Sequence, residues 1–364
     1  MNRDALWSLL ILRGIPPKLI DLVLALYSDT ESVVRCGTTV SDPFPVPTGV
    51  RQGCVLAPTL FNTCMDWVLG RVADGSGCGA SIGDVTITDL DFADDAVVFA
   101  ELVETLIEAL EKLSEESEPL GLRVSWPKTQ IQAFNGILDA AVQSVTVGCE
   151  TVKLTDRFTY LGSDISVTAN CDLEVNKRLG RAWGVMNSLN KGVWHSRYLC
   201  RKTKVMVFKT LVLPILLYGC ETWTLSQDLR RRLNAFGTKS LRRILRYRWW
   251  HRVSNDDLLK ETGMRHVTCI IRERQLRQFG HVVRFPETDP VRRILLADDP
   301  AGARRPRGRP QLTWLRQIER YFREMGMGRV SARRIAEGNP EAYRRKVNAA
   351  TCCHGACSHT YSIG

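Results

Sequence analysis

Two adjacent carboxylates, those of Asp94 and Asp95, are the groups in this sequence whose type and placement point most directly to chemistry. They lie between residues 84–91, which alternate apolar and polar side chains, and the apolar run 96–100, so Phe92-Ala93-Asp94-Asp95 is predicted at the tip of a β-hairpin. Carboxylate oxygens are hard ligands that suit Mg²⁺, and paired Mg²⁺ ions support phosphoryl transfer. Taken alone, the pair is better explained as a polar surface turn, in which adjacent aspartates are common.

Three further segments accompany this hairpin in a definite order. Upstream, Arg51-Gln52-Gly53 lies just before a helix that is predicted to begin behind Pro58. Downstream come Gly121-Leu122-Arg123-Val124-Ser125-Trp126-Pro127-Lys128-Thr129 and then Phe158-Thr159-Tyr160-Leu161-Gly162-Ser163.

In this order the segments resemble those of LINE-type (non-LTR) retrotransposon reverse transcriptases. The palm of that family carries an arginine-glutamine-glycine loop leading into a helix, a Phe/Tyr-Ala-Asp-Asp hairpin, a Gly-Leu…Lys-Thr segment and a Tyr-Leu-Gly strand, and this sequence supplies all four. Leu217–Trp223 and Gly308-Arg309-Pro310 with Trp314 look like the downstream region of vertebrate elements, so the resemblance covers nearly the whole chain. It implies RNA-directed DNA polymerisation with Mg²⁺, an RNA template and a DNA primer or other nucleic acid. No obligate protein partner is evident from the sequence.

The resemblance also implies roles for individual residues. Asp94 is expected to be a catalytic metal ligand with Asp95 as its acidic neighbour, and Lys128 is expected to supply a proton or a positive charge to the departing pyrophosphate. The residues expected beside the template and the incoming nucleotide are Arg51, Gln52 and Gly53, and those expected in the primer grip are Tyr160, Leu161 and Gly162. Simpler explanations exist for two of them: Lys128 as a solvated lysine and Gly53 as a residue that permits a turn.

One family feature has no counterpart here. Family members place an aspartate after an aromatic residue in a strand just before the helix that here begins near Asp4, and that strand would precede residue 1. We therefore expect an amino-terminally truncated chain that lacks the first catalytic aspartate and is inactive as a polymerase. Asp4 is better explained by its place at a helix start, where an acid interacts favourably with the helix dipole. The alternative function is that of a non-catalytic nucleic-acid-binding remnant.

Charge is divided unevenly along the 364 residues. Residues 1–200 hold 16 Lys and Arg against 25 Asp and Glu, a net charge of −9, whereas residues 201–364 hold 34 against 14, a net charge of +20. Such a basic excess is expected where phosphates must be neutralised, although a solvated basic surface looks similar. The second half is therefore the candidate nucleic-acid-binding part.

Two stretches of this half are candidate contacts. The run 242–252 mixes basic and aromatic side chains, which suits phosphate contact combined with base stacking. Its arginines Arg242, Arg243, Arg246 and Arg248 are the candidates, while Trp249 is expected to pack inward as part of a basic helix. The second stretch, Arg304–Pro310 with Arg307 and Arg309, fits either an extended strand in an A·T-rich minor groove or a solvated linker.

The carboxyl-terminal residues Cys352, Cys353, His354, Cys357 and His359 form a further cluster of metal-ligating types. Their spacing fits no standard zinc finger, which pairs two ligand couples across a longer segment. We therefore expect a disordered tail rather than a zinc site.

The periodicity of apolar residues predicts an α+β unit followed by a helical, basic region. The resemblance implies that the first is a partial right-hand polymerase palm, an antiparallel sheet with packed helices, and that the second is an all-helical basic thumb and carboxyl-terminal region. Predicted strands are 32–40, 44–46, 84–91, 96–100, 123–126, 130–134, 142–147, 151–154 and 158–161. Predicted helices are a pair within 4–27, one after Pro58, and 101–118, 172–190, 200–218, 228–247, 254–262, 266–284, 312–325 and 330–349.

Shifts in composition predict boundaries that divide the chain into 1–166, 167–297, an Arg/Pro/Gly linker at 298–311 and a helical extension with its tail at 312–364. The resemblance implies that 1–166 is a fingers remnant and palm and that 167–297 is a thumb-like region. No stretch reaches the ~18 to 20 apolar residues of a membrane span, and the start lacks the apolar core of a signal peptide. We expect an intracellular protein, nuclear or cytoplasmic and not secreted, with its 12 cysteines reduced.

Overall fold

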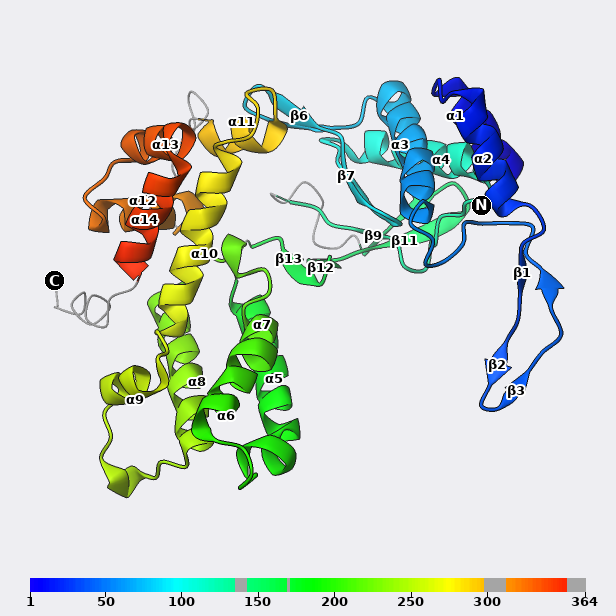
Figure 1. Ribbon diagram of the computed structural model, residues 1–364. Helices are drawn as coiled ribbons and strands as arrows, with labels where there is room; N and C mark the ends of the chain where they lie inside the picture. The colour runs from blue at the N-terminus through cyan, green and yellow to red at the C-terminus, as the bar shows by residue number, and fades with distance from the viewer. Residues whose placement is uncertain (135–142, 169–170, 298–311, 352–364) are drawn as a thin grey trace. The chain divides into compact units, whose positions relative to one another are not determined.

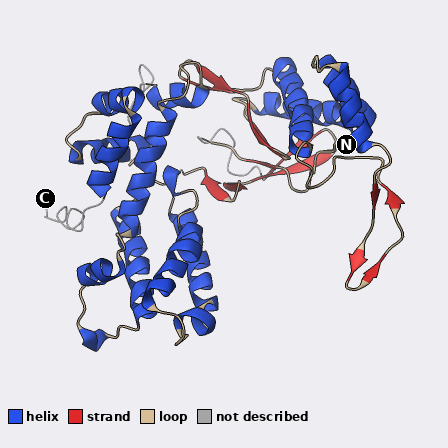
Figure 2. Cartoon of the chain, viewed as in Figure 1, coloured by secondary structure: helices blue, strands red, loops and turns tan. Residues whose placement is uncertain are grey.

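The computed structural model describes residues 1–134, 143–168, 171–297 and 312–351. The chain divides into two compact units, residues 1–158 and 159–364. Among the described residues, strands occur only in the part of the chain before α5, and the rest is helical (Figure 2). Each of four buried apolar clusters draws its residues from a single unit, so each unit has its own core.

The first unit is built on packed helices. They are α1 (Arg3–Leu12), α2 (Pro17–Tyr27), α3 (Ala57–Ser76) and α4 (Val103–Ser117), followed by the 3-10 turn η1 (Glu118–Leu120). Asn2, not Asp4, caps α1, because its side-chain oxygen accepts hydrogen bonds from the backbone amides of Asp4 and Ala5. Asp4 is exposed in the first turn of the helix. Leu6, Cys64 and Val68, all fully buried, lie at the centre of the main apolar cluster of this unit.

The strands of the chain are short and form sheets of two or three strands. They are β1 (Glu31–Ser32), β2 (Arg35–Cys36), β3 (Thr39–Val40), β4 (Phe44–Pro45), β5 (Ala80–Ile82), β6 (Val85–Ile87), β7 (Asp89–Phe92), β8 (Asp95–Val98), β9 (Gln130–Ile131), β10 (Ser144–Val147), β11 (Glu150–Leu154), β12 (Arg157–Tyr160) and β13 (Ser163–Ser166). The predicted antiparallel sheet is thus divided into pieces, and β9 pairs with β11 in parallel. A second, smaller cluster packs α4 against β9, β10 and β11.

The strand predicted at 123–126 is absent from the structure, so that prediction was wrong. Gly121, with φ of +64°, ends η1, and Ser125 then begins a turn in which its carbonyl accepts a hydrogen bond from the amide of Lys128 at 2.9 Å. Pro127 sits inside that turn and lacks an amide hydrogen for a strand ladder. The turn therefore replaces the strand that Val124 and Trp126 favoured by propensity.

Apart from the end of β12 and β13, the described part of the second unit is helical. Its elements are α5 (Asp172–Ser188), the π-helical turns η2 (Asn190–Trp194) and η3 (Phe208–Val212), α6 (Arg201–Val207), α7 (Leu213–Leu216), η4 (Cys220–Thr222), α8 (Gln227–Leu245), η5 (Trp249–His251), α9 (Asn255–Thr262), α10 (Val267–Val282), α11 (Pro290–Leu296), α12 (Trp314–Glu324), α13 (Arg329–Gly338) and α14 (Pro340–Thr351). The predicted helix 330–349 is two helices, because Pro340 cannot continue the first one. The sequence patterns did not predict α11.

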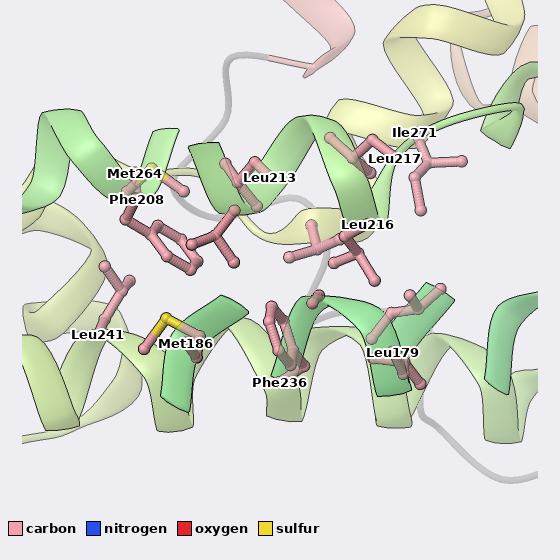
Figure 3. Packing of buried hydrophobic residues seen from close by; sticks show 14 of the residues in the cluster. Leu179, Met186, Phe208, Leu213, Leu216, Leu217, Phe236, Leu241, Met264 and Ile271 are labelled. Atoms are coloured by element: carbon pink, nitrogen blue, oxygen red, sulfur yellow. The ribbon is translucent and has the colours of Figure 1, made fainter. Parts of the chain in front are cut away.

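Two apolar clusters hold this unit together. In the larger one, side chains of η3 and α7 face those of α5 and α8; Figure 3 labels Phe208, Leu213, Leu216, Met186, Leu179 and Phe236 there. Phe208 and Phe236 stack with their ring centroids 6.4 Å apart. The helix α10 takes part in both clusters, with Ile271 in the first and Phe279 in the second, and Figure 1 shows its length along the unit.

Within the described ranges, no helix combines the length and the apolar character that crossing a bilayer would require.

Candidate active site and nucleic-acid surface

The acidic pair lies at the tip of the hairpin that β7 and β8 form. The strands are antiparallel with Phe92 opposite Asp95, which leaves Ala93 and Asp94 as a two-residue turn. Ala93 has φ of +56°, a left-handed conformation that alanine adopts only at a cost in energy. Both carboxylates are exposed. Their type, paired hard oxygens on a tight turn, fits Mg²⁺.

The base of the hairpin is anchored while its tip extends into solvent. The backbone amide of Phe99 donates a hydrogen bond of 2.8 Å to the carbonyl of Thr88, which extends the β7–β8 ladder by one pair. Val98 packs against the main apolar cluster of the first unit. The exposed carboxylates are thus carried on strands whose other end is tied to the core.

The Arg51-Gln52-Gly53 loop is held on the α1–α2 helical pair. The amide of Arg51 donates to the hydroxyl of Tyr27 at 3.4 Å, and Gly53 has φ of +84°. Tyr27 is buried, and this burial raises the pKa of its hydroxyl. Arg3 adds a second anchor, because its side chain donates to the carbonyls of Gly49 and Tyr27, each at 3.0 Å. Arg51 and Gln52 themselves remain exposed.

Lys128 is exposed in the turn before β9. Three motifs are anchored on the main apolar cluster of the first unit. Leu122, in the segment that contains Lys128, packs against this cluster, and so do Val50, next to Arg51, and Val98, in the hairpin strand β8. Three of the four motifs therefore share one core. Across the described residues, no three His, Cys, Asp or Glu side chains lie close enough together to hold a metal ion.

The fourth motif, Tyr160-Leu161-Gly162, belongs to the second unit apart from the start of its strand. It forms the turn between β12 and β13, with φ of +47° at Leu161 and +79° at Gly162. Tyr218 donates its hydroxyl to the carbonyl of Leu161 at 2.7 Å, and Arg178 donates to the carbonyl of Gly162 at 2.5 Å. The guanidinium of Arg178 also lies 4.5 Å from the centre of the Tyr218 ring. Two side chains therefore fix the turn from the side of the helices.

A buried ion pair supports this arrangement. Glu174 and Arg178, one helical turn apart in α5, are each 4% exposed, and the Glu174 carboxylate accepts from Arg178 at 2.5 Å. The other oxygen of that carboxylate accepts from the backbone amide of Asp164 at 3.0 Å. Lys177 pairs with the Asp164 side chain. Sequence reasoning missed these residues, although their i, i+4 spacing in α5 was visible as a possible pair.

The downstream segments Leu217–Trp223 and Trp314 contact one another. The indole nitrogen of Trp314 donates to the carbonyl of Glu221 at 2.7 Å. Gln275, fully buried, donates to the carbonyls of Cys220 and Trp223 at 3.0 and 2.7 Å. Burial also raises the pKa of the Cys220 thiol to about 12, so it remains protonated at neutral pH. These residues stabilise the fold of the helical unit.

The arginines of the run 242–252 differ in their surroundings. Those at positions 242, 243 and 246 are bonded within the protein: Arg242 to the Val253 carbonyl, Arg243 to the Asn187 side chain and Arg246 to the His195 carbonyl, each at 2.7 Å. Arg248 is exposed and lies 6.0 Å from the ring centre of Trp250. Trp249 is 86% exposed, so the expectation that it packs inward was wrong. The helix ends at Arg246, in a left-handed conformation, before it reaches Trp249.

The two units differ in the sign of their net charge. Residues 1–158 contain 11 Lys and Arg against 22 Asp and Glu, and residues 159–364 contain 39 against 17. The first unit is therefore acidic and the second strongly basic. Arg307, Arg309 and the cluster from Cys352 to His359 lie outside the described residues.

Comparison with known proteins identifies the first unit. Residues 2–165 match the family model of the reverse transcriptase (RNA-dependent DNA polymerase). A putative uncharacterized transposon-derived protein of Caenorhabditis elegans is 29% identical over 207 residues, which cover 54% of this chain and 72% of that protein.

Two Pol polyproteins of R2 retrotransposable elements also match. That of the type-2 element R2DM of Drosophila melanogaster is 29% identical over 178 residues, which cover 46% of this chain and 16% of the polyprotein. That of the type-1 element R2 of Nasonia vitripennis is 31% identical over 112 residues, which cover 31% of this chain and 11% of the polyprotein. The chain thus spans a small part of either polyprotein. The motifs and these matches identify residues 2–165 as a reverse transcriptase domain of the kind found in non-LTR retrotransposons.

Proposed function

We propose that this chain binds nucleic acid through its basic helical unit and presents, at the Asp94–Asp95 hairpin, the metal-binding carboxylates of a reverse transcriptase. The observation that carries the proposal is the exposed acidic tip on a core-anchored hairpin, within the segment that matches the family. The residues that contact the template and the incoming nucleotide are Arg51, Gln52 and Gly53. Lys128 supplies a proton or a positive charge to the leaving pyrophosphate. The turn at Leu161 contacts the primer end.

The proposed metal is Mg²⁺, held by the two carboxylates. When bound, paired divalent cations activate an attacking hydroxyl and stabilise a departing pyrophosphate. The shared anchoring of Val50, Leu122 and Val98 on one apolar cluster supports a common location for the three motifs of the first unit. We propose the same division of the chain as before: a palm with a fingers remnant at 1–166, a helical thumb at 167–297, a linker at 298–311 and a carboxyl-terminal extension at 312–364.

We propose further that a polypeptide of these 364 residues does not itself extend a primer. Asp94 and Asp95 come from one hairpin, whereas two-metal phosphoryl transfer draws its carboxylates from more than one strand. Nucleic-acid binding does not require the complete set of metal-binding carboxylates, since it depends on basic residues that neutralise phosphates. The polypeptide is then a binding protein with a partial catalytic site.

A primer-extension assay tests this division. Purified protein is incubated with a labelled DNA primer on an RNA template, deoxynucleotides and Mg²⁺, beside an active reverse transcriptase as positive control. We expect the primer to be shifted in a native gel but not lengthened, both for the natural chain and for Asp94→Asn. Extension by the natural chain that Asp94→Asn abolishes would show that the polypeptide is a complete polymerase.

A further inference from the structure

The segment Arg246–Arg252 presents two tryptophans to solvent. It joins α8 to α9 at one end of the helical unit (Figure 1). The exposed fractions are 86% for Trp249 and 57% for Trp250, although tryptophan is on average a largely buried residue. Core packing therefore does not explain their presence.

The two indoles belong to a small cluster of aromatic and basic side chains. Their ring centres are 5.7 Å apart and nearly perpendicular, at 85°, so they present faces in different directions. His251 stacks on Trp250 with the ring centres 5.8 Å apart and an angle of 23°. The guanidinium of Arg248 lies 6.0 Å from the centre of the same indole. The cluster thus combines the flat faces of the two indoles with the positive charge of Arg248.

The backbone of the segment is held in a strained conformation. Arg246 and Arg252, which flank the tryptophans, have φ of +61° and +47°, values that are costly for residues with a side chain. Such conformations persist where neighbouring contacts impose them, and they concentrate at functional sites. The contacts here are the bonds from Arg246 to the His195 carbonyl and from Tyr247 to Glu261, both 2.7 Å. The backbone that carries the two tryptophans is therefore anchored at its Arg246 end.

We propose that Trp249 and Trp250 form a stacking platform for unpaired bases of a single-stranded nucleic acid. The inference rests on the proposed function and specifies which form of nucleic acid this surface takes. Aromatic faces stack on any base, and nearby cations track the backbone, so this combination binds single strands with little sequence preference.

Charge complementarity supports this ligand. The platform segment contains three arginines and a histidine and no acid. The nearest acids along the chain are Asp256 and Asp257 in the first turn of α9, and Asp257 accepts a hydrogen bond from Ser254 at 2.7 Å. A duplex would leave the indoles without partners, because its bases are already stacked on each other.

The test measures binding by fluorescence anisotropy, with the full chain and labelled oligo(U) RNA, oligo(dT) DNA and a DNA duplex. Replacing both tryptophans, Trp249→Ala with Trp250→Ala, should weaken binding of the single strands about 30-fold and leave the duplex within about twofold. The slope of affinity against salt should not change, since no phosphate contact is lost. The matched control, Trp249→Phe with Trp250→Phe, keeps aromatic faces and should restore most of the affinity.

Each outcome has a distinct meaning. Equal loss for single strands and duplex, or no loss for either, overturns the platform while leaving the proposed function intact. Failure of the natural chain to bind any of the three probes overturns the proposed function itself, and the platform with it. If the natural chain self-associates and the alanine pair makes it monomeric without changing binding to the probes, the tryptophans form a protein contact and the inference is wrong. If the natural chain binds oligo(U) and oligo(dT) with different affinities, the tighter one shows whether RNA or DNA is the favoured single-stranded ligand.

Discussion

A polypeptide of residues 159–364 should bind DNA and RNA almost as tightly as the whole chain does, whereas residues 1–158 should bind at least about 100-fold more weakly. The reason is charge: the second unit has 39 basic against 17 acidic residues, and the first has 11 against 22. Both polypeptides should fold, because the apolar clusters of each unit lie wholly within it. Circular dichroism would check folding, and filter binding would measure affinity.

Salt provides the control for this prediction. If six or more phosphates are neutralised, the affinity of residues 159–364 for duplex should fall about 10³-fold or more between roughly 50 and 200 mM salt. Binding that is insensitive to salt would show that contacts to bases, rather than charge, dominate. Equal affinity of the two polypeptides would contradict the assignment of binding to the helical unit.

The second large effect is expected at the buried ion pair of α5. Glu174→Ala should lower the free energy of unfolding by about 3–5 kcal/mol, because it leaves the buried guanidinium of Arg178 without its carboxylate. It also removes the acceptor for the backbone amide of Asp164. Chemical denaturation of residues 159–364 would measure the change.

Two further variants separate the ion pair from a general loss of packing. Glu174→Leu combined with Arg178→Met should be much more stable than Glu174→Ala, because an apolar pair leaves no uncompensated charge. Arg231→Ala removes an exposed pair with Asp228, in which both side chains are more than 60% exposed, and should cost less than about 1 kcal/mol. A similar small effect for Glu174→Ala would mean that the buried pair does not stabilise the Tyr160–Gly162 turn as described.

The sequence predicted the hairpin well because two independent signals agreed there. Residues 84–91 alternate, the run from Ala96 onward is apolar, and the structure has β7 ending at Phe92 and β8 beginning at Asp95. The long helices were predicted for a similar reason, since an apolar stripe over many turns leaves little ambiguity. Local pattern and tertiary packing favour the same conformation in these places.

Prediction failed where a single feature overrode the pattern. Trp249 was expected to pack inward as part of a basic helix, but α8 ends before it, at a left-handed residue, Arg246, and the indole is exposed. The segment 123–126 has strand propensity, yet a turn forms around Pro127. The burial of Gln275 depends on Cys220, which is 55 residues away along the chain, so no local signal identifies it. For Glu174 the i, i+4 spacing indicated a possible ion pair with Arg178, but not that the pair is buried beneath the turn at Gly162 and Asp164.

The position at which a divalent metal binds tests most directly whether Asp94 and Asp95 form the metal site. Fe²⁺ can replace Mg²⁺, and with ascorbate and peroxide it cleaves the backbone beside its site. We predict cuts at residues 92–95 and near Gln52, suppressed by excess Mg²⁺ and lost in Asp94→Asn with Asp95→Asn. Asp91→Asn, which removes another exposed carboxylate of the same hairpin, should leave the cuts in place. Cuts that avoid the hairpin, or that persist when Asp94 and Asp95 are replaced, would contradict the assignment of this acidic pair as the metal site of the reverse transcriptase domain.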